Sequence, residues 1–198
     1  MPEDEIRSAI NILNRGGIII FPTDTAFGIG CRIDNPDAVK KLFLLRHRPA
    51  EMAVPVLVSS IKMAEKYLLS PLPDNVRHLM NDFWPGGLTV LLPCRTDSVT
   101  PLVRADGNNL GVRMPDHQKI LKIIKEVGVP ILAPSANFHR DPTPYSFEEL
   151  NPELVKKVDF AVTGECKFKQ ASSVIDCSRI PWKIIRRGTS IINLNSYV

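Results

Sequence analysis

Small hydrogen-bonding side chains recur in this chain directly after apolar segments. In the stretch FPTDTAFGIGC, the Thr-Asp-Thr group at 23–25 follows the apolar run 18–21, and Pro-Ser-Ala-Asn at 134–137 follows the apolar run 129–133. Ligands of open α/β sheets bind at the carboxyl ends of the strands, and small hydroxyls accommodate carboxylate or phosphate oxygens without steric conflict. Threonine, aspartate and asparagine also favour turns, so each group predicts either a ligand pocket or a simple turn.

Arginines are the second set of candidate groups. Arg46 and Arg48 in Leu-Arg-His-Arg-Pro stand where Pro49 ends a predicted helix. They either interact favourably with the helix dipole or form a two-pronged guanidinium clamp on a polyphosphate. Arg113 lies in the otherwise apolar strand 110–113, where a guanidinium requires an anionic partner. That partner is a protein carboxylate or a substrate carboxylate, and we favour the substrate.

Hydroxyls and guanidiniums recur near the end of the chain, in SSVID (172–176) and IIRRG (184–188). The sequence contains no P-loop, GxGxxG, HExxH or GxSxG signature, and it indicates neither a Cys/His nor a Ser/His/Asp set. Hydroxyls and arginines without a nucleophile suit positioning and charge neutralisation. Nucleotidyl and phosphoryl transfers are accelerated mostly by these means.

Cysteine spacing argues against a zinc site. The four cysteines, at 31, 94, 166 and 177, form no CxxC pair and have no histidine at ligand spacing. Buried thiols in a reducing compartment are the preferred interpretation.

Helical and extended patterns alternate along the chain and must position these groups. Helical periodicity predicts a helix over 6–13, a helix after the cap Asn35, helices over 60–68 and 75–83, a helix capped by Asp116, and a short helix opened by Ser146. Apolar runs predict strands over 18–21, 54–58, 88–92, 110–113, 129–133, 160–162, 174–176 and 183–185. The alternation predicts one α/β domain, residues 1–198, around a central mixed sheet.

Composition and charge bound the class of protein. The chain has 198 residues, 44% of them hydrophobic and 23% charged, which is ordinary for a soluble globular protein. No apolar run approaches the length of a membrane span, and the acidic start MPEDEIRSAI is neither a signal nor a transit peptide. We therefore expect a cytoplasmic protein. The net charge of +4 is compatible with a phosphate-bearing partner but does not require one.

Taken together, the motifs resemble the YrdC-like family, whose members are threonylcarbamoyl-AMP synthases. FPTDTAFGIGC, LRHRP, WPGGLTVLL, GVRMPDH, APSAN, SSVID and IIRRG occur in the order of the family, from about residue 16 to residue 188. The resemblance implies a single-domain YrdC-like fold, a twisted mixed sheet flanked by helices with a concave basic face. It is closest to the form of the family without an extra C-terminal domain.

The resemblance also implies a reaction and its participants. L-threonine, bicarbonate and ATP would give L-threonylcarbamoyladenylate and pyrophosphate, with Mg²⁺ accompanying the ATP. A partner enzyme would transfer the threonylcarbamoyl group to an adenosine of tRNA, and contact with tRNA or double-stranded RNA stays open. Three departures from the family pattern, at Arg46, Phe27 and Met52, motivate an alternative, a non-catalytic RNA-binding member of the same fold. Carbamoyl transfer to another small molecule is a third reading.

Site residues follow from the matching motifs. The resemblance implies that L-threonine is bound by Thr25, Arg113, Ala133 and Ser172. It implies that ATP is bound by Arg46, Arg48, Asn109, Ser135, Asn137, Thr143 and Arg186. The implied mechanism needs no protein nucleophile, because a threonine-derived carbamate attacks the α-phosphorus while the arginines offset the charge on the phosphates.

Overall fold

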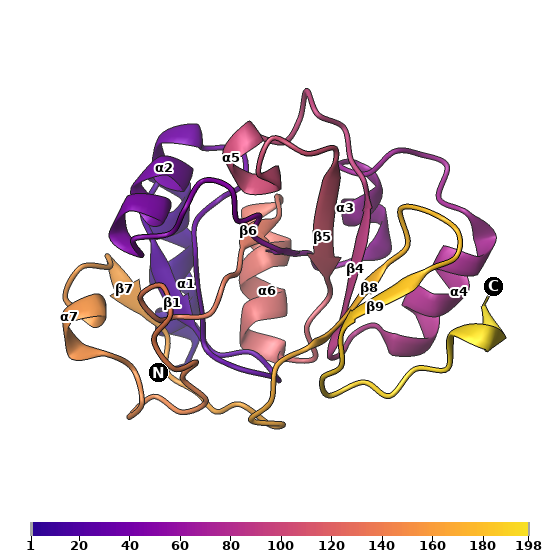
Figure 1. The fold of residues 1–198 in the computed structure, drawn as a ribbon. Coiled ribbons are helices and arrows are strands. Elements are labelled where there is room, and N and C mark those ends of the chain that lie inside the picture. The colour runs from indigo at the N-terminus through magenta and orange to yellow at the C-terminus, as the bar shows by residue number, and fades with distance from the viewer. Residues whose placement is uncertain (1, 198) are drawn as a thin grey trace.

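Two β-sheets with helices packed on them make up residues 2–197, the part of the chain that this computed structural model describes (Figure 1). The smaller sheet has the order β2-β1-β7, with β1 (Ile19–Phe21) antiparallel to β2 (Gly28–Gly30) and parallel to β7 (Phe160–Ala161). The larger sheet has the order β6-β3-β5-β4-β8-β9. Its strands are β3 (Val56–Leu57), β4 (Leu88–Pro93), β5 (Asn109–Arg113), β6 (Ile131–Leu132), β8 (Ser173–Asp176) and β9 (Lys183–Arg186).

Both sheets combine parallel and antiparallel pairs, so the predicted mixed α/β class is confirmed. The prediction of one central sheet is wrong, because β1 pairs with β2 and β7 and with no strand of the larger sheet. In Figure 1 the smaller sheet lies on the left, and β4, β8 and β9 lie on the right.

Helices cover the sheets on both sides. They are α1 (Pro2–Asn14), α2 (Pro36–Leu45), α3 (Ile61–Glu65), α4 (Asp74–Phe83), α5 (Pro101–Arg104), α6 (Gln118–Val127) and α7 (Pro152–Val155), with a final 3₁₀ turn at Leu194–Ser196. The helices α1 and α6 pack against each other (Figure 1). Their contact buries Ala9 and Leu13 of α1 against Ile120 and Ile124 of α6. No helix among residues 2–197 is long and apolar enough to cross a membrane.

Strand β1 is apolar on both faces because each face belongs to a different core cluster. Ile20 packs in the larger cluster, together with Phe27 and Ile29, whereas Ile19 and Phe21 pack in the cluster beneath α1 and α6. Successive side chains of a strand point to opposite faces. This confirms the prediction of an interior strand, which is the middle strand of the smaller sheet.

Helix boundaries confirm one predicted cap and contradict two others. The Asn35 side chain accepts a hydrogen bond from the Ala38 N–H at 3.0 Å and begins α2, as predicted. Asp116 is not the cap of α6, because α6 begins at Gln118 after His117, which makes no side-chain cap bond. Ser146 opens turns rather than a helix.

The helix predicted at Ser146 starts later in the chain, at α7. There Pro152 takes the first helical position, and the Asn151 side chain accepts from the Glu153 N–H at 2.9 Å. Proline disfavours a helical conformation in the residue before it, so the chain cannot enter Pro152 from a helix already formed. The Glu149 carboxylate instead accepts from the Tyr145 N–H at 2.7 Å.

Candidate active site

A polar cavity of about 210 Å³ is lined by residues of both sheets and of the loops between them. Eight of the eleven predicted site residues line it: Thr25, Arg48, Arg113, Ala133, Ser135, Thr143, Ser172 and Arg186. Some of these residues, such as Thr25 and Arg186, lie far apart in the sequence, and the fold brings them to one cavity. The volume is below the ~300–1,000 Å³ typical of drug-sized ligand sites, so the enclosed part suits a small molecule.

Sheet register explains how Arg113 reaches this cavity. Leu57 of β3 pairs with Arg113 of β5, and Val112 pairs with Val90 of β4. One step further along the same antiparallel register, Thr89 lies opposite Arg113. Neighbouring side chains in a row across a sheet point to the same face. Leu57, Arg113 and Thr89 therefore form a row on one side of the cavity, and all three line it.

The Arg113 guanidinium is held by the protein itself. Its Nε donates to the Gly86 carbonyl at 2.9 Å, its Nη1 donates to Thr25 Oγ1 at 2.5 Å, and its Nη2 donates to the Asp24 carboxylate. The Asp24 side chain is fully buried, and the Arg113 side chain is 7% exposed. Burial lowers the pKa of Arg113, and the Asp24 charge opposes that shift.

Asp24 is therefore the anion that the strand position of Arg113 requires, which corrects the prediction of a substrate carboxylate in that role. A guanidinium carries five N–H groups, and three of those of Arg113 are used within the protein. Two N–H groups are left for a ligand.

Thr25 presents a hydrogen-bond acceptor to the cavity. The Thr23 hydroxyl donates to the Ala26 carbonyl at 2.6 Å, so it has no hydrogen left for Thr25. Thr23 Oγ1 also accepts from the backbone N–H groups of Thr25 and Ala26, at 3.2 and 3.1 Å, so both of its lone pairs are used. The Thr25 hydroxyl, 3.1 Å away, therefore keeps its own hydrogen. Thr25 Oγ1 also accepts from Arg113. With one lone pair and its hydrogen unused, Thr25 can accept from a ligand amine or donate to a ligand oxygen.

Arg46 and Asn137 lie behind the cavity wall and do not line it. Arg46 is 3% exposed, and it donates from Nε to the Asn137 carbonyl and from Nη2 to Asn137 Oδ1, both at 2.9 Å. The Ser135 hydroxyl donates to the same Oδ1 at 2.7 Å, and Asn137 Nδ2 donates to the Asp141 carbonyl at 2.5 Å. Direct contact of Arg46 and Asn137 with a nucleotide stays a prediction; neither residue lines the cavity, and protein atoms take most of their polar groups.

This arrangement also sets the polarity of Ser135. Its hydroxyl hydrogen points to Asn137, so Ser135 offers the cavity lone pairs only. Arg46 remains a source of positive charge close to the wall. Burial, together with the charge of Arg48, lowers its pKa to about 10, and its Nη1 has no hydrogen-bond partner among residues 2–197.

Arg48 and Arg186 supply positive charge that no protein carboxylate neutralises within the described residues. Arg48 donates to the backbone carbonyls of Met52 and Ala53, at 2.9 and 2.6 Å. Arg186 donates to the Ser172 carbonyl at 2.8 Å and to the Ser172 hydroxyl at 3.0 Å. Burial lowers the pKa of both arginines. Because Asp24 balances Arg113, the cavity keeps the charge of two guanidiniums, which suits phosphate oxygens.

Asn109 is not part of the cavity. It starts β5 and pairs with Pro93, at the opposite end of the strand from Arg113. Conversely, the sequence reasoning assigned no role to Pro55, Leu57 or Thr89, although all three line the cavity. For Thr89 there was a signal, because it is the only hydroxyl in the apolar strand LTVLL.

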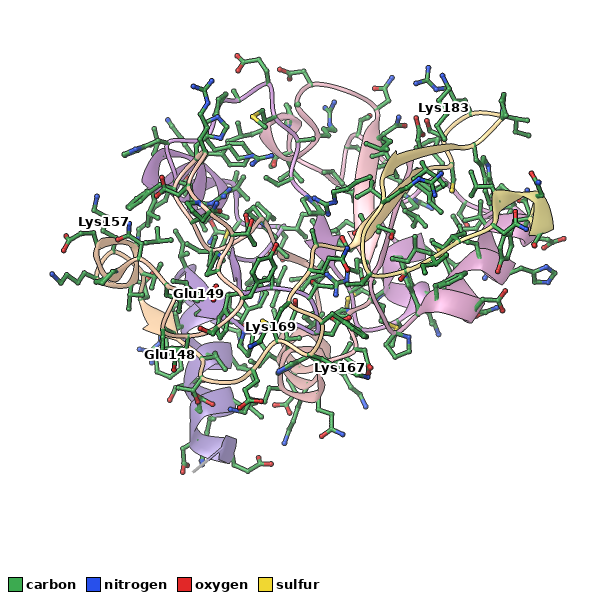
Figure 2. The ribbon with its side chains drawn as sticks, turned by 60° about the horizontal axis from the view of Figure 1, so that its bottom comes forward. Glu148, Glu149, Lys157, Lys167, Lys169 and Lys183 are labelled. Atoms are coloured by element: carbon green, nitrogen blue, oxygen red, sulfur yellow. The ribbon has the colours of Figure 1, made fainter. Side chains whose placement is uncertain are left out.

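The lysines on the lower face of the molecule do not form one basic stripe. Lys157, Lys169 and Lys183 are spread across this face, whereas Glu148 lies near Lys169 (Figure 2). Lys167 pairs with Asp116 at 3.6 Å.

Fold and cavity together define a class of protein: an α/β domain with a cavity lined by guanidiniums and small hydroxyls, groups that suit an anion. The family described as "Telomere recombination", which groups Sua5, YciO and YrdC, matches residues 11–188. The chain belongs to this family, as its motifs predicted.

Individual relatives agree with this assignment. The chain is 37% identical to the threonylcarbamoyl-AMP synthase of Bacillus subtilis over 82% of its own length and 46% of that protein. It is 30% identical to the synthase of Vibrio parahaemolyticus over 93% of its length and 100% of that protein. The crystal structure of P. abyssi Sua5 complexed with L-threonine superposes with a TM-score of 0.85 at 31% identity, over 92% of this chain and 54% of that one. The chain thus spans about half the length of the B. subtilis and P. abyssi proteins.

Proposed function

We propose that this chain is a nucleotidyltransferase that makes L-threonylcarbamoyladenylate from L-threonine, bicarbonate and ATP, with release of pyrophosphate. One observation carries the proposal: Arg48, Arg113 and Arg186 converge with small hydroxyls on a single cavity that has no nucleophile. The names of the relatives, and the L-threonine bound to P. abyssi Sua5, support the choice of reaction and amino acid.

L-threonine occupies the part of the cavity around Arg113. Its carboxylate accepts from the two N–H groups of Arg113 that the protein leaves unused. Its amine faces Thr25, which offers an acceptor. Ala133 and Ser172 complete this part of the wall. An amino acid suits the place because it brings an anion to the guanidinium and a donor to the hydroxyl.

The phosphates of ATP lie at the part of the cavity that Arg48 and Arg186 line, and the rest of the nucleotide extends out of the open side of the cavity. Ser135 and Thr143 line the same part. Because Ser135 offers only lone pairs, it faces a donor of the nucleotide, such as a ribose hydroxyl, rather than a phosphate oxygen. Arg46 and Asn137 support this wall from behind, and we assign no contact to Asn109.

The reaction proceeds without a covalent enzyme intermediate. The threonine amine and bicarbonate condense to a carbamate with loss of water. A carbamate oxygen attacks the α-phosphorus of ATP, the bond from the α-phosphorus to the bridging oxygen breaks, and pyrophosphate leaves with that oxygen. Arg48 and Arg186 offset the charge that develops on the phosphates. The enclosed cavity limits access of water to the labile carbamate and mixed anhydride.

Mg²⁺ enters this proposal only as part of its substrate, the Mg–ATP complex. No carboxylate lines the cavity. Among residues 2–197 no group of three or more His, Cys, Asp or Glu side chains is placed to hold a metal. The chain itself therefore offers Mg²⁺ no set of ligands, and the ion would be carried by the phosphates.

The product is consumed by a second enzyme that transfers the threonylcarbamoyl group to tRNA, and we propose a cytoplasmic location for the protein. The product is an activated acyl donor, so it suits direct transfer. For a non-catalytic RNA-binding role we find no supporting feature, since the labelled lysines of Figure 2 are dispersed. We therefore propose no contact with double-stranded RNA.

Release of pyrophosphate tests the proposal. The purified chain is incubated with Mg–ATP, bicarbonate and L-threonine, and pyrophosphate is followed with a coupled phosphate assay. We expect release that requires threonine and bicarbonate together, and mass spectrometry should detect threonylcarbamoyl-AMP. Release that is equal without threonine, or no release at all, contradicts the proposal. Release driven by carbamoyl phosphate instead would favour carbamoyl transfer to another small molecule.

A further inference from the structure

Thr89 is a cavity residue to which the motifs assign no role. It stands in β4, is 5% exposed and lines the cavity. It lies beside Arg113 in the row of side chains across the larger sheet. Whatever amino acid has its carboxylate at Arg113 must therefore place its side chain within reach of Thr89 or of the neighbour on the other side, Leu57.

A hydrogen-bond chain ends at the Thr89 hydroxyl. Arg186 Nη2 donates to Ser172 Oγ at 3.0 Å, and Ser172 Oγ lies 2.9 Å from Thr89 Oγ1. A guanidinium can only donate, so Ser172 accepts from it, and it can pass its own hydrogen to Thr89. Bonds that run in one direction strengthen one another. Among residues 2–197 the Thr89 hydroxyl has no other partner, so when Ser172 donates to it the Thr89 hydrogen is free for a ligand.

The methyl group of Thr89 faces the opposite way, over Gly111. A Cβ built on Gly111 would meet Pro55 Cβ at 3.5 Å and Thr89 Cγ2 at 3.6 Å. Both distances are ordinary contacts, so Pro55 and the Thr89 methyl flank the position that the missing side chain leaves open. Thr89 therefore presents a hydroxyl on one side and an apolar surface on the other.

We propose that Thr89 selects the amino acid, and this inference rests on the function proposed above. Its hydroxyl donates to the side-chain hydroxyl of L-threonine, and its methyl group, with Pro55, contacts the substrate methyl. The hydroxyl and the methyl group of Thr89 thus contact the side-chain hydroxyl and the methyl group of L-threonine. L-serine lacks the methyl, and L-2-aminobutyrate lacks the hydroxyl.

Calorimetric titration with L-threonine, L-serine and L-2-aminobutyrate tests this directly, without turnover. Thr89→Val keeps the methyl and loses the hydroxyl. We expect it to bind threonine about tenfold more weakly than the original chain, with 2-aminobutyrate almost unaffected, so that the preference between them disappears. Thr89→Ser keeps the hydroxyl and loses the methyl. It should retain the preference for threonine over 2-aminobutyrate and lose about fourfold in its preference over serine.

Thr100→Val is the matched control, because the Thr100 hydroxyl has no hydrogen-bond partner within the described part of the chain and lies outside the cavity. It should bind all three amino acids as the original chain does. Circular dichroism of each variant checks folding, and Thr89→Ser decides the matter if Thr89→Val does not fold. The inference is overturned if Thr89→Val keeps the preference for threonine, or if the original chain shows none. Selective binding without pyrophosphate release would instead overturn the proposed reaction and leave the role of Thr89 intact.

Discussion

Arg46 donates one hydrogen bond to the backbone carbonyl of Asn137 and a second to its side-chain oxygen, each at 2.9 Å. The pair fixes the orientation of the amide, because the reversed amide would direct its NH₂ group at a guanidinium that has no acceptor. The same Asn137 side-chain oxygen accepts a hydrogen bond from Ser135, which lines the cavity. Arg46 therefore acts as a positioning residue for the wall rather than as a phosphate ligand.

Arg46→Met and Asn137→Ala test this relay. If Arg46 acts through Asn137, each variant should lower kcat/KM for ATP by about tenfold, and the double variant should be no worse than either single one, since neighbours in one network are non-additive. Effects that add in the double variant would show that Arg46 contacts the substrate independently. Arg77→Met, which removes an arginine from α4 outside the cavity, is the control and should leave kcat/KM unchanged.

The buried pair of Asp24 and Arg113 predicts an effect on stability. Asp24→Asn leaves a buried guanidinium without its counter-charge, and removal of one partner of such a pair costs about 3–5 kcal/mol in free energy of unfolding. Urea denaturation measures it. The double variant Asp24→Asn/Arg113→Met should regain part of the loss. Asp34→Asn removes one half of the more exposed Arg32–Asp34 pair and should cost at most about 1 kcal/mol. Equal costs at the two pairs would contradict the assignment.

Neighbouring arginines at the end of the chain provide a matched comparison. Arg186 lines the cavity and bonds to Ser172, whereas Arg187 does not line it. Arg186→Met should lower kcat/KM for ATP by about a hundredfold, the order expected for loss of one group that stabilises developing charge. Arg187→Met should change it by less than about twofold. Steady-state release of pyrophosphate at varied ATP concentration measures kcat/KM for both variants. Similar losses of kcat/KM in the two variants would argue for a general effect of basic charge.

Buried thiols predict how stability depends on pH. Burial raises the pKa of Cys31 to about 12, from 9.0 in the unfolded chain. Above pH 9 the unfolded thiol ionises while the folded thiol keeps its proton, so rising pH favours unfolding. Between pH 9 and 12 this thiol should reduce the free energy of unfolding by about 1.4 kcal/mol per pH unit. Cys31→Ala should flatten the slope by that amount in urea denaturation. Identical slopes would mean that the thiol ionises equally in both states.

Local features of the fold could be predicted from the sequence because they depend on neighbours in the chain. Apolarity on both faces placed β1 in the interior, and Asn35 before Pro36 located the start of α2. The hydroxyls at the ends of strands indicated the cavity, because strand ends of an α/β fold gather at one edge. Failures near the chain surface, such as the helix predicted at Ser146, came from turn chemistry that competes with helix signals.

What could not be predicted depends on pairings between distant residues. Arg113 and Asp24 are 89 positions apart, and no local pattern indicates that they meet. The same holds for Arg46 and Asn137, which are 91 positions apart. The matching motifs named eight of the residues that line the cavity. Which of them would be neutralised or turned away by a protein partner follows only from the tertiary structure.

The walls of the cavity, from Thr23 to Arg186, draw on nearly the whole length of the chain. During synthesis on the ribosome, domains fold from the N-terminal side as the chain emerges. A nascent chain that has released β1, β5 and Arg113 still lacks Ser172 and Arg186. Capacity to hold an anion should therefore arise only after Ser172 and Arg186 have emerged, so that ligand binding marks a domain whose last cavity residues are in place.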